Sequence, residues 1–233
     1  MDNAIETIEY RGFNIGIYQD DNPMNPRTEQ DNLCAMVCWH RRYDLGDKHK
    51  FSDPDDFQDW MEAEGYKPDK NIFLLPLYLY DHSGLSISTG SFSCSWYSSQ
   101  VGWIYLTAER YKAECLRPGK LRPDGINHEL HPIKHITAKD RSRIDELLKG
   151  EVKEYDQYLT WRVYGFMIEP TDRNKSIDCG DSSCWGFYGD TDYMISEAKS
   201  SIDYAIKAYR EKVKAEYAKR KAVDALVKNS FAL

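Results

Sequence analysis

Two cysteines lie in segments where a thiol nucleophile could be activated. Cys94 lies in a run of hydroxyl and aromatic residues at positions 91–100 (SFSCSWYSSQ), and His82 lies in the turn that precedes this run. A thiol beside an imidazole base is the usual arrangement for thiol-dependent acyl transfer. Cys184, in a glycine-rich segment, is a second candidate nucleophile. The pattern allows a thiol-dependent hydrolase or transferase that uses Cys94 or Cys184. Packing cysteines and a hydrogen-bonded turn histidine explain the same residues without chemistry.

Two further groups contain side chains of the kinds that bind metal ions. One group combines a predicted strand with a later loop: Cys34, Cys38 and His40 with Cys179 and Cys184. The other gathers side chains within eight residues: His128, Glu129, His131 and His135. Neither cysteine pair, Cys34/Cys38 or Cys179/Cys184, has the two-residue gap of a zinc knuckle, and Pro132 breaks any helix that would align the histidines. We therefore expect buried packing cysteines and surface histidines, with no metal and no cofactor.

Aromatic residues and a basic helix end are the features that suit binding to another protein. Aromatic residues make up 13% of the chain, with 17 tyrosines and 6 tryptophans, more than a core alone needs. Large rings and arginines carry much of the binding energy at protein interfaces. The interaction residues that we predict are Trp96, Tyr97, Trp103, Trp185, Tyr188, Arg210 and Lys214.

Composition limits the class of protein. The chain has 233 residues, of which 41% are hydrophobic and 30% charged, which is enough for one large folded domain. A net charge of −7 argues against general affinity for nucleic acid or anionic membranes. No run approaches the roughly 18 apolar residues of a membrane span, and no secretion signal is evident. We expect a cytoplasmic protein with six free thiols.

The pattern of apolar residues predicts an α+β fold with a mostly antiparallel sheet of five to seven strands. The central run FLLPLYLY at 73–80 is typical of a buried strand, and with 85–89 and 101–106 it predicts a three-stranded meander. Helix patterns with N-terminal caps predict helices at 53–64, 138–159 and 191–228. We expect one body at 1–190 followed by the long helix 191–228.

The predicted last helix changes character along its length. Its first half carries a continuous apolar stripe from Ile195 to Val213, which favours docking on the body. Residues 207–228 hold eight basic and three acidic side chains, a net of +5, which leaves −12 for the rest of a chain whose total is −7. We expect this second half to contact a partner or a second copy in a homodimer.

Five stretches resemble an uncharacterised family of proteins encoded by bacteriophages, prophages and other mobile elements. They are residues 31–47 (DNLCAMVCWHRRYDLGD), 77–84 (LYLYDHSG), 92–105 (FSCSWYSSQVGWIY), 154–164 (EYDQYLTWRVY) and 183–189 (SCWGFYG). The resemblance implies a bacterial cytoplasmic setting and no known activity. In the relatives we would expect proline at Ser95 and an acidic residue at Tyr97. We predict a non-enzymatic interaction protein that binds a host protein, for example an inhibitor of a defence nuclease of the anti-CRISPR or anti-restriction type.

Overall fold

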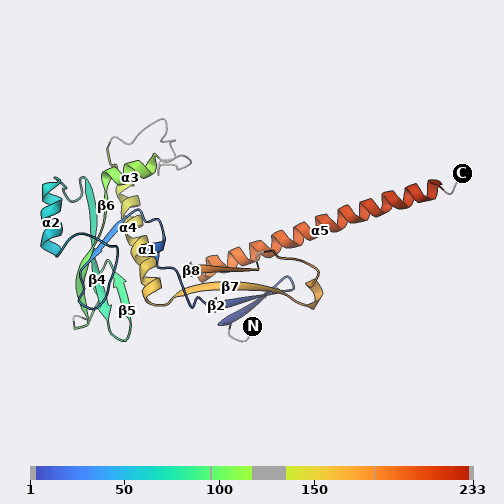
Figure 1. Ribbon diagram of the computed structural model, residues 1–233, viewed down its shortest axis with the longest axis horizontal. Coiled ribbons are helices and arrows are strands. Elements are labelled where there is room, and N and C mark those ends of the chain that lie inside the picture. Colours follow the sequence, from blue (N-terminus) through green and yellow to red (C-terminus); the bar gives the residue numbers. More distant parts are fainter. Residues whose placement is uncertain (1–3, 95, 117–134, 181, 231–233) are drawn as a thin grey trace. The chain divides into compact units, whose positions relative to one another are not determined.

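The structure is a computed structural model that describes residues 4–94, 96–116, 135–180 and 182–230, with side chains up to residue 224. The chain divides into two compact units. We call Met24–Arg162 the central unit, and Met1–Pro23 together with Val163–Leu233 the terminal unit. Each unit has its own antiparallel four-stranded sheet, its own helices and its own buried core (Figure 1).

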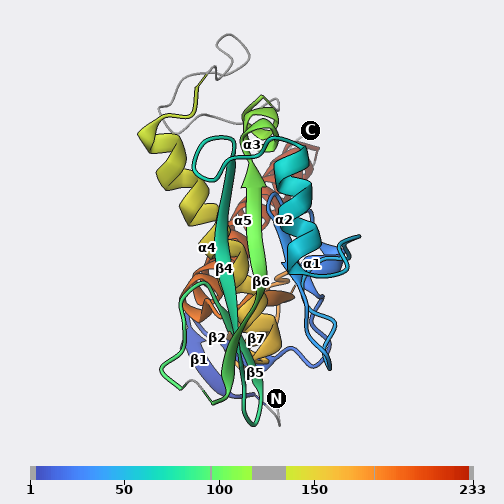
Figure 2. The same cartoon turned by 90° about the vertical axis from the view of Figure 1, so that its left-hand side faces the viewer.

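The sheet of the central unit is organised around β4 (Ile72–Asp81), the predicted apolar strand. The strand order is β3-β6-β4-β5, with β3 at Ala35–Cys38, β5 at Leu85–Ser88 and β6 at Ser98–Thr107. The strands are therefore present, but the predicted meander is wrong, because β6 pairs with β4 and not with β5 (Figure 2). An apolar strand buried on both faces needs a partner on each edge, and the short β5 covers only the last four residues of β4.

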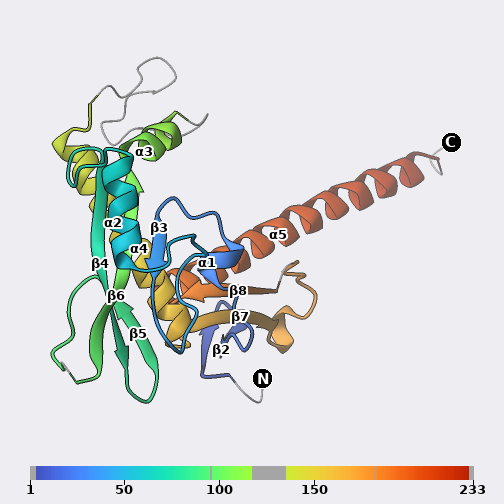
Figure 3. The ribbon, with the colours of Figure 1, turned by 60° about the vertical axis from the view of Figure 1, so that its left-hand side comes forward.

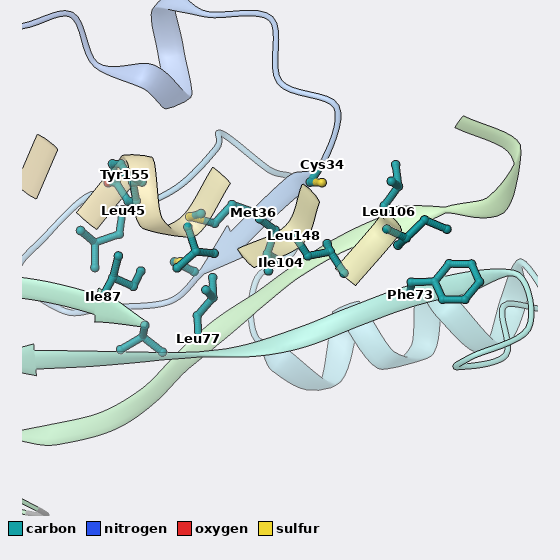
Figure 4. Close-up of a cluster of buried hydrophobic side chains, with 14 of the residues drawn as sticks. Cys34, Met36, Leu45, Phe73, Leu77, Ile87, Ile104, Leu106, Leu148 and Tyr155 are labelled. Atoms are coloured by element: carbon teal, nitrogen blue, oxygen red, sulfur yellow. The ribbon is translucent and has the colours of Figure 1, made fainter. Parts of the chain in front are cut away.

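Two helices cover opposite faces of this sheet, α4 (Ala138–Leu159) and α2 (Pro54–Ala63) (Figure 3). Thr137 begins α4 with a capping box that it shares with Asp140. One face of α4 packs on the apolar face of the sheet, as Figure 4 shows for Leu148 and Tyr155 beside Met36, Ile104 and Leu77. The shorter helices of this unit are α1 (Pro26–Glu29) and α3 (Ala108–Cys115).

The terminal unit joins the two ends of the chain in one sheet. Its order is β1-β2-β7-β8, from Glu6–Tyr10, Phe13–Gln19, Val163–Pro170 and Ser183–Tyr188. The β1–β2 turn has positive φ at Arg11 (51°) and Gly12 (79°), and a short 3-10 helix η1 (Asp172–Asn174) follows β7. The first half of α5 (Thr191–Ser230) docks on this sheet through Met194, Ala198, Ile202 and Ile206.

The α+β class, the antiparallel pairing and the long C-terminal helix are confirmed, but the strands form two sheets and not one. The N-terminal hairpin pairs with β7, a strand some 150 residues later in the chain, and local patterning carries no signal for such a pairing. The N-terminus of α5 is capped by Asp190, whose carboxylate accepts a hydrogen bond from the backbone N–H of Tyr193 at 2.9 Å.

Candidate binding surface

The strongest candidate site is an aromatic surface of the central unit at the C-terminal end of β4. We call it the aromatic patch, and it consists of His40, Tyr43, Tyr80, His82, Phe92, Trp96 and Tyr97. The end of β4 supplies Tyr80, and the turn after it supplies His82. The backbone N–H of Asp81 donates to the carbonyl of Tyr97 at 2.9 Å, which fixes the start of β6 beside the end of β4. Backbone pairing therefore brings distant segments of the sequence together here.

Ring contacts hold part of the patch in place. His82 meets Tyr97 edge-on with ring centroids 4.3 Å apart, and Tyr80 contacts Phe92 at 5.5 Å and Tyr97 at 6.4 Å. Tyr97 is nevertheless 48% exposed, and Trp96 beside it is 92% exposed. A large exposed ring next to an ordered aromatic cluster is typical of the centre of a protein interface.

An ion pair borders the rings. The guanidinium of Arg42 binds the carboxylate of Asp81 and lies 5.3 Å from the centre of the Tyr43 ring. The hydroxyl of Tyr43 also donates to Asp81 at 3.3 Å, and the His40 ring stacks on Tyr43 at 5.0 Å. Arg42 is 67% exposed, so a partner can reach its guanidinium. Three of the five stretches on which the family resemblance rests contribute to this surface.

Cys94 and His82 lie in the same region but are not arranged as a nucleophile and base. No hydrogen bond joins them in the part of the chain that the structure describes. The His82 ring packs against Tyr97, and its Nδ1 lies 3.4 Å from the hydroxyl of Ser83. Cys94 is half-buried. The geometry therefore favours a role for His82 in holding Tyr97.

The other predicted aromatic residues have different surroundings. Trp103 lies beneath α2, stacked on Phe57 at 5.7 Å and edge-on to Trp39 at 5.9 Å, so its ring is part of the fold of the central unit. In the terminal unit, Trp185 on β8 is 45% exposed, covers Gly165 and contacts Tyr18 at 6.1 Å. Tyr188, also on β8, is half-buried.

The remaining thiols are buried or isolated. Cys34 and Cys38 are buried in the core of the central unit, where desolvation raises the pKa of both thiols, that of Cys38 to about 12. Burial also raises the pKa of the Cys179 thiol, whereas Cys184 is exposed on β8. Within the described residues there is no group of three or more His, Cys, Asp or Glu side chains that could hold a metal ion. His128, Glu129 and His131 lie outside those residues, and His135 is exposed.

Arg210 and Lys214 lie on α5 beyond its docked half. Each described residue from position 210 to 224 is exposed, so this part of the helix adds no buried residue to the core of its unit. No helix in the described part of the chain has the length and apolar character to cross a membrane.

Comparison of the chain with known protein families, with curated proteins and with solved structures finds no match. The sequence analysis named Trp96 and Tyr97 as interaction residues and His82 as a possible base, but it did not name Arg42, Tyr43 or Tyr80. The available signal was the cluster of basic and aromatic residues HRRY directly after an apolar strand, together with the aspartate that ends FLLPLYLYD.

Proposed function

We propose that this protein is a non-enzymatic interaction protein that binds a bacterial host protein through the aromatic patch. The observation that carries the proposal is that Trp96 is 92% exposed beside the ordered pair of His82 and Tyr97. Burying one such ring in a partner's pocket contributes about 2 kcal/mol or more at an interface hot spot. The exposed Arg42, oriented by Asp81 and Tyr43, supplies a directed charge at the rim.

The specific form that we propose is inhibition of a defence nuclease or of its effector complex in the bacterial cytoplasm. The resemblance to phage and mobile-element proteins motivates this form, since such elements meet host defence nucleases. A patch with a rigid aromatic centre and a charged rim suits a protein that occupies a surface of an enzyme.

The decisive experiment has two stages. Tagged protein captures its partner from host lysate, and the purified pair is then measured by calorimetry with wild type, Trp96→Ala and Tyr97→Ala. We expect each substitution to weaken binding by tenfold or more, following the roughly 2 kcal/mol of a hot-spot ring. Tyr204→Ala is the matched control, because Tyr204 is 76% exposed and belongs to α5 of the terminal unit, not to the patch. Unchanged affinity in both patch variants would refute the proposed site.

The inhibitory form has its own readout. Cells that carry a restriction or CRISPR system and express the protein should be infected more efficiently by unmodified phage than cells that express Trp96→Ala. Equal plating for the two proteins across strains with and without defence systems would reject inhibition but leave the binding measurement intact.

An alternative function is a thiol-dependent hydrolase or transferase. The exposed Cys184 and the half-buried Cys94 are the observations that favour it. A catalytic thiol reacts with iodoacetamide well below about pH 8, because catalysis requires a depressed thiol pKa. Slow reaction of both cysteines until the protein is unfolded would remove this alternative.

A further inference from the structure

Four cations of α5 from Lys207 onward lie on one face of the helix. Lys207, Arg210, Lys214 and Lys221 follow one another at spacings of three, four and seven residues, and Tyr217 occupies the position between the last two. With 3.6 residues per turn these side chains form one stripe, about 21 Å long from Lys207 to Lys221. We call these five residues the basic stripe. Glu211 lies beside the stripe, four residues after Lys207 and three before Lys214.

The cations of the basic stripe are available for a ligand. All five stripe residues are exposed, and none of the four cations forms an ion pair within the described residues. By contrast, Arg11 nearby binds Asp203 at 2.8 Å. Unpaired cations along one face of an otherwise unpacked helix can attract a ligand of opposite charge.

At its docked end the stripe meets a groove in the terminal unit. The groove has a volume of about 520 Å³ and is lined by Arg11, Asn174, Ile177, Ile206, Tyr209 and Arg210. A guanidinium from the β1–β2 turn and one from α5 are both among its lining residues. The Tyr209 hydroxyl accepts from Ser176 at 3.2 Å and keeps its own proton to donate. Guanidinium and hydroxyl donors of this kind bind phosphate oxygens well.

We propose that the basic stripe and this groove bind the phosphodiester backbone of single-stranded nucleic acid. Tyr217 and Tyr209 distinguish this ligand from other polyanions, because rings set among cations stack on bases while the cations follow the phosphates. Tyr217 is 70% exposed, so its face is open to a base. A duplex keeps its bases stacked inside and cannot use these rings. The whole-chain charge of −7, which argued against nucleic acid, hides a helix segment whose net charge is +5.

The test is fluorescence anisotropy of the full-length protein with a labelled oligothymidylate, repeated over a range of sodium chloride concentrations. Four phosphate contacts on a single strand give a slope of log K against log salt of about −2.8, so affinity should fall about fiftyfold between roughly 50 and 200 mM salt. The variant Lys214→Gln/Lys221→Gln should halve that slope, and its affinity should then fall only about sevenfold over the same interval.

Matched controls separate the stripe from net charge and from aromatic content. Lys212→Gln/Lys219→Gln removes the same charge from the opposite face of α5 and should keep the full slope. Tyr217→Ala should weaken binding at least about fivefold through loss of a stacked base. Tyr204→Ala, which removes a similarly exposed tyrosine off the stripe, should leave affinity unchanged.

Several outcomes overturn the proposal. They are no binding to oligonucleotide at low salt, equal effects of the two lysine pairs, tighter binding of duplex than of single strand, or equal binding of poly-glutamate, which would indicate an acidic protein partner. This surface is independent of the aromatic patch. Trp96→Ala should leave oligonucleotide binding intact, so failure here and failure of the proposed host-protein binding are distinguishable.

Discussion

Removing the Arg27 side chain should destabilise the central unit more than removing any surface cation. The guanidinium is fully buried, and it donates to both oxygens of Asp47 at 2.8 and 2.7 Å, to Glu151 at 2.7 Å and to the carbonyl of Cys34 at 3.0 Å. Burial disfavours its charged form, but the two carboxylates more than offset this cost and raise the pKa of Arg27 above its ordinary value. These contacts hold together α1, β3, the loop that contains Asp47, and α4.

The magnitude follows from what the substitution leaves behind. In Arg27→Met the carboxylates of Asp47 and Glu151, 27% and 15% exposed, would face each other without a cation. Breaking a buried ion pair by removing one partner costs about 3–5 kcal/mol. Backbone N–H groups still bind both acids, Met36 to Asp47 and Leu33 to Glu151, so we expect the lower end, about 3 kcal/mol.

Urea denaturation followed by tryptophan fluorescence measures this change, because Trp39, Trp60 and Trp103 all lie in the aromatic cluster of the central unit. The control is Arg143→Met, which removes an exposed cation paired with Glu146 at 3.2 Å and should cost less than about 1 kcal/mol. If unpaired carboxylates cause the loss, adding Glu151→Gln to Arg27→Met should recover part of it. A cost below about 1 kcal/mol for Arg27→Met would refute the reasoning.

Three further predictions test other parts of the fold. Gly102→Ala should lower the free energy of unfolding by about 2–3 kcal/mol, because its methyl group would lie 1.9 Å from the carbonyl oxygen of Val37 in β3. Gly150→Ala in α4, with open space around it, should raise the free energy of unfolding by about 1 kcal/mol in the same urea titration. Mass spectrometry after brief thiol labelling should find Cys184 modified in the native protein and the buried Cys38 only after unfolding; labelling of Cys38 in the native state would contradict its burial. Truncation after Tyr209 should lower the melting temperature measured by circular dichroism by less than about 2 °C, because the described residues that it removes are all exposed. A larger fall would show that these residues pack on the rest of the terminal unit.

Sequence patterns predicted the individual helices and strands well because their signals are local. Asp53 and Thr137 cap α2 and α4 as their side chains suggest, and the run FLLPLYLY forms a strand along its whole length. Each of these features depends on side chains within a few residues of one another. Local signals therefore fixed the class of the fold and most of its elements.

Partition of the strands into two sheets had no local signal. The strand β2 has the same apolar alternation whether its partner is β3 or β7, and only tertiary packing selects between them. The packing of Trp103 beneath α2 was not predicted, for a related reason. Its neighbours on β6 alternate between the two faces of the sheet, and the sequence did not show that α2 would cover the face that carries Trp103.

The stretch at 31–47, the longest of those that carry the family resemblance, separates into residues that the fold requires and residues that it does not. Gly46 has φ of 73°, and an added Cβ would lie 2.8 Å from the carbonyl oxygen of Met36, while Asp47 holds the buried Arg27. These two positions are explained by packing and ion pairing alone.

Arg42 in the same stretch is 67% exposed and has no role in the core, whereas Tyr43 is partly buried against the core of the central unit. Both residues contact Asp81, a partly exposed residue at the edge of the aromatic patch. An exposed ion pair contributes only about 0–1 kcal/mol to stability, so the need to fold does not account for this arrangement. Side chains ordered at a surface without a benefit to folding are available to bind a partner, which is why we propose the partner-binding role for this end of the sheet.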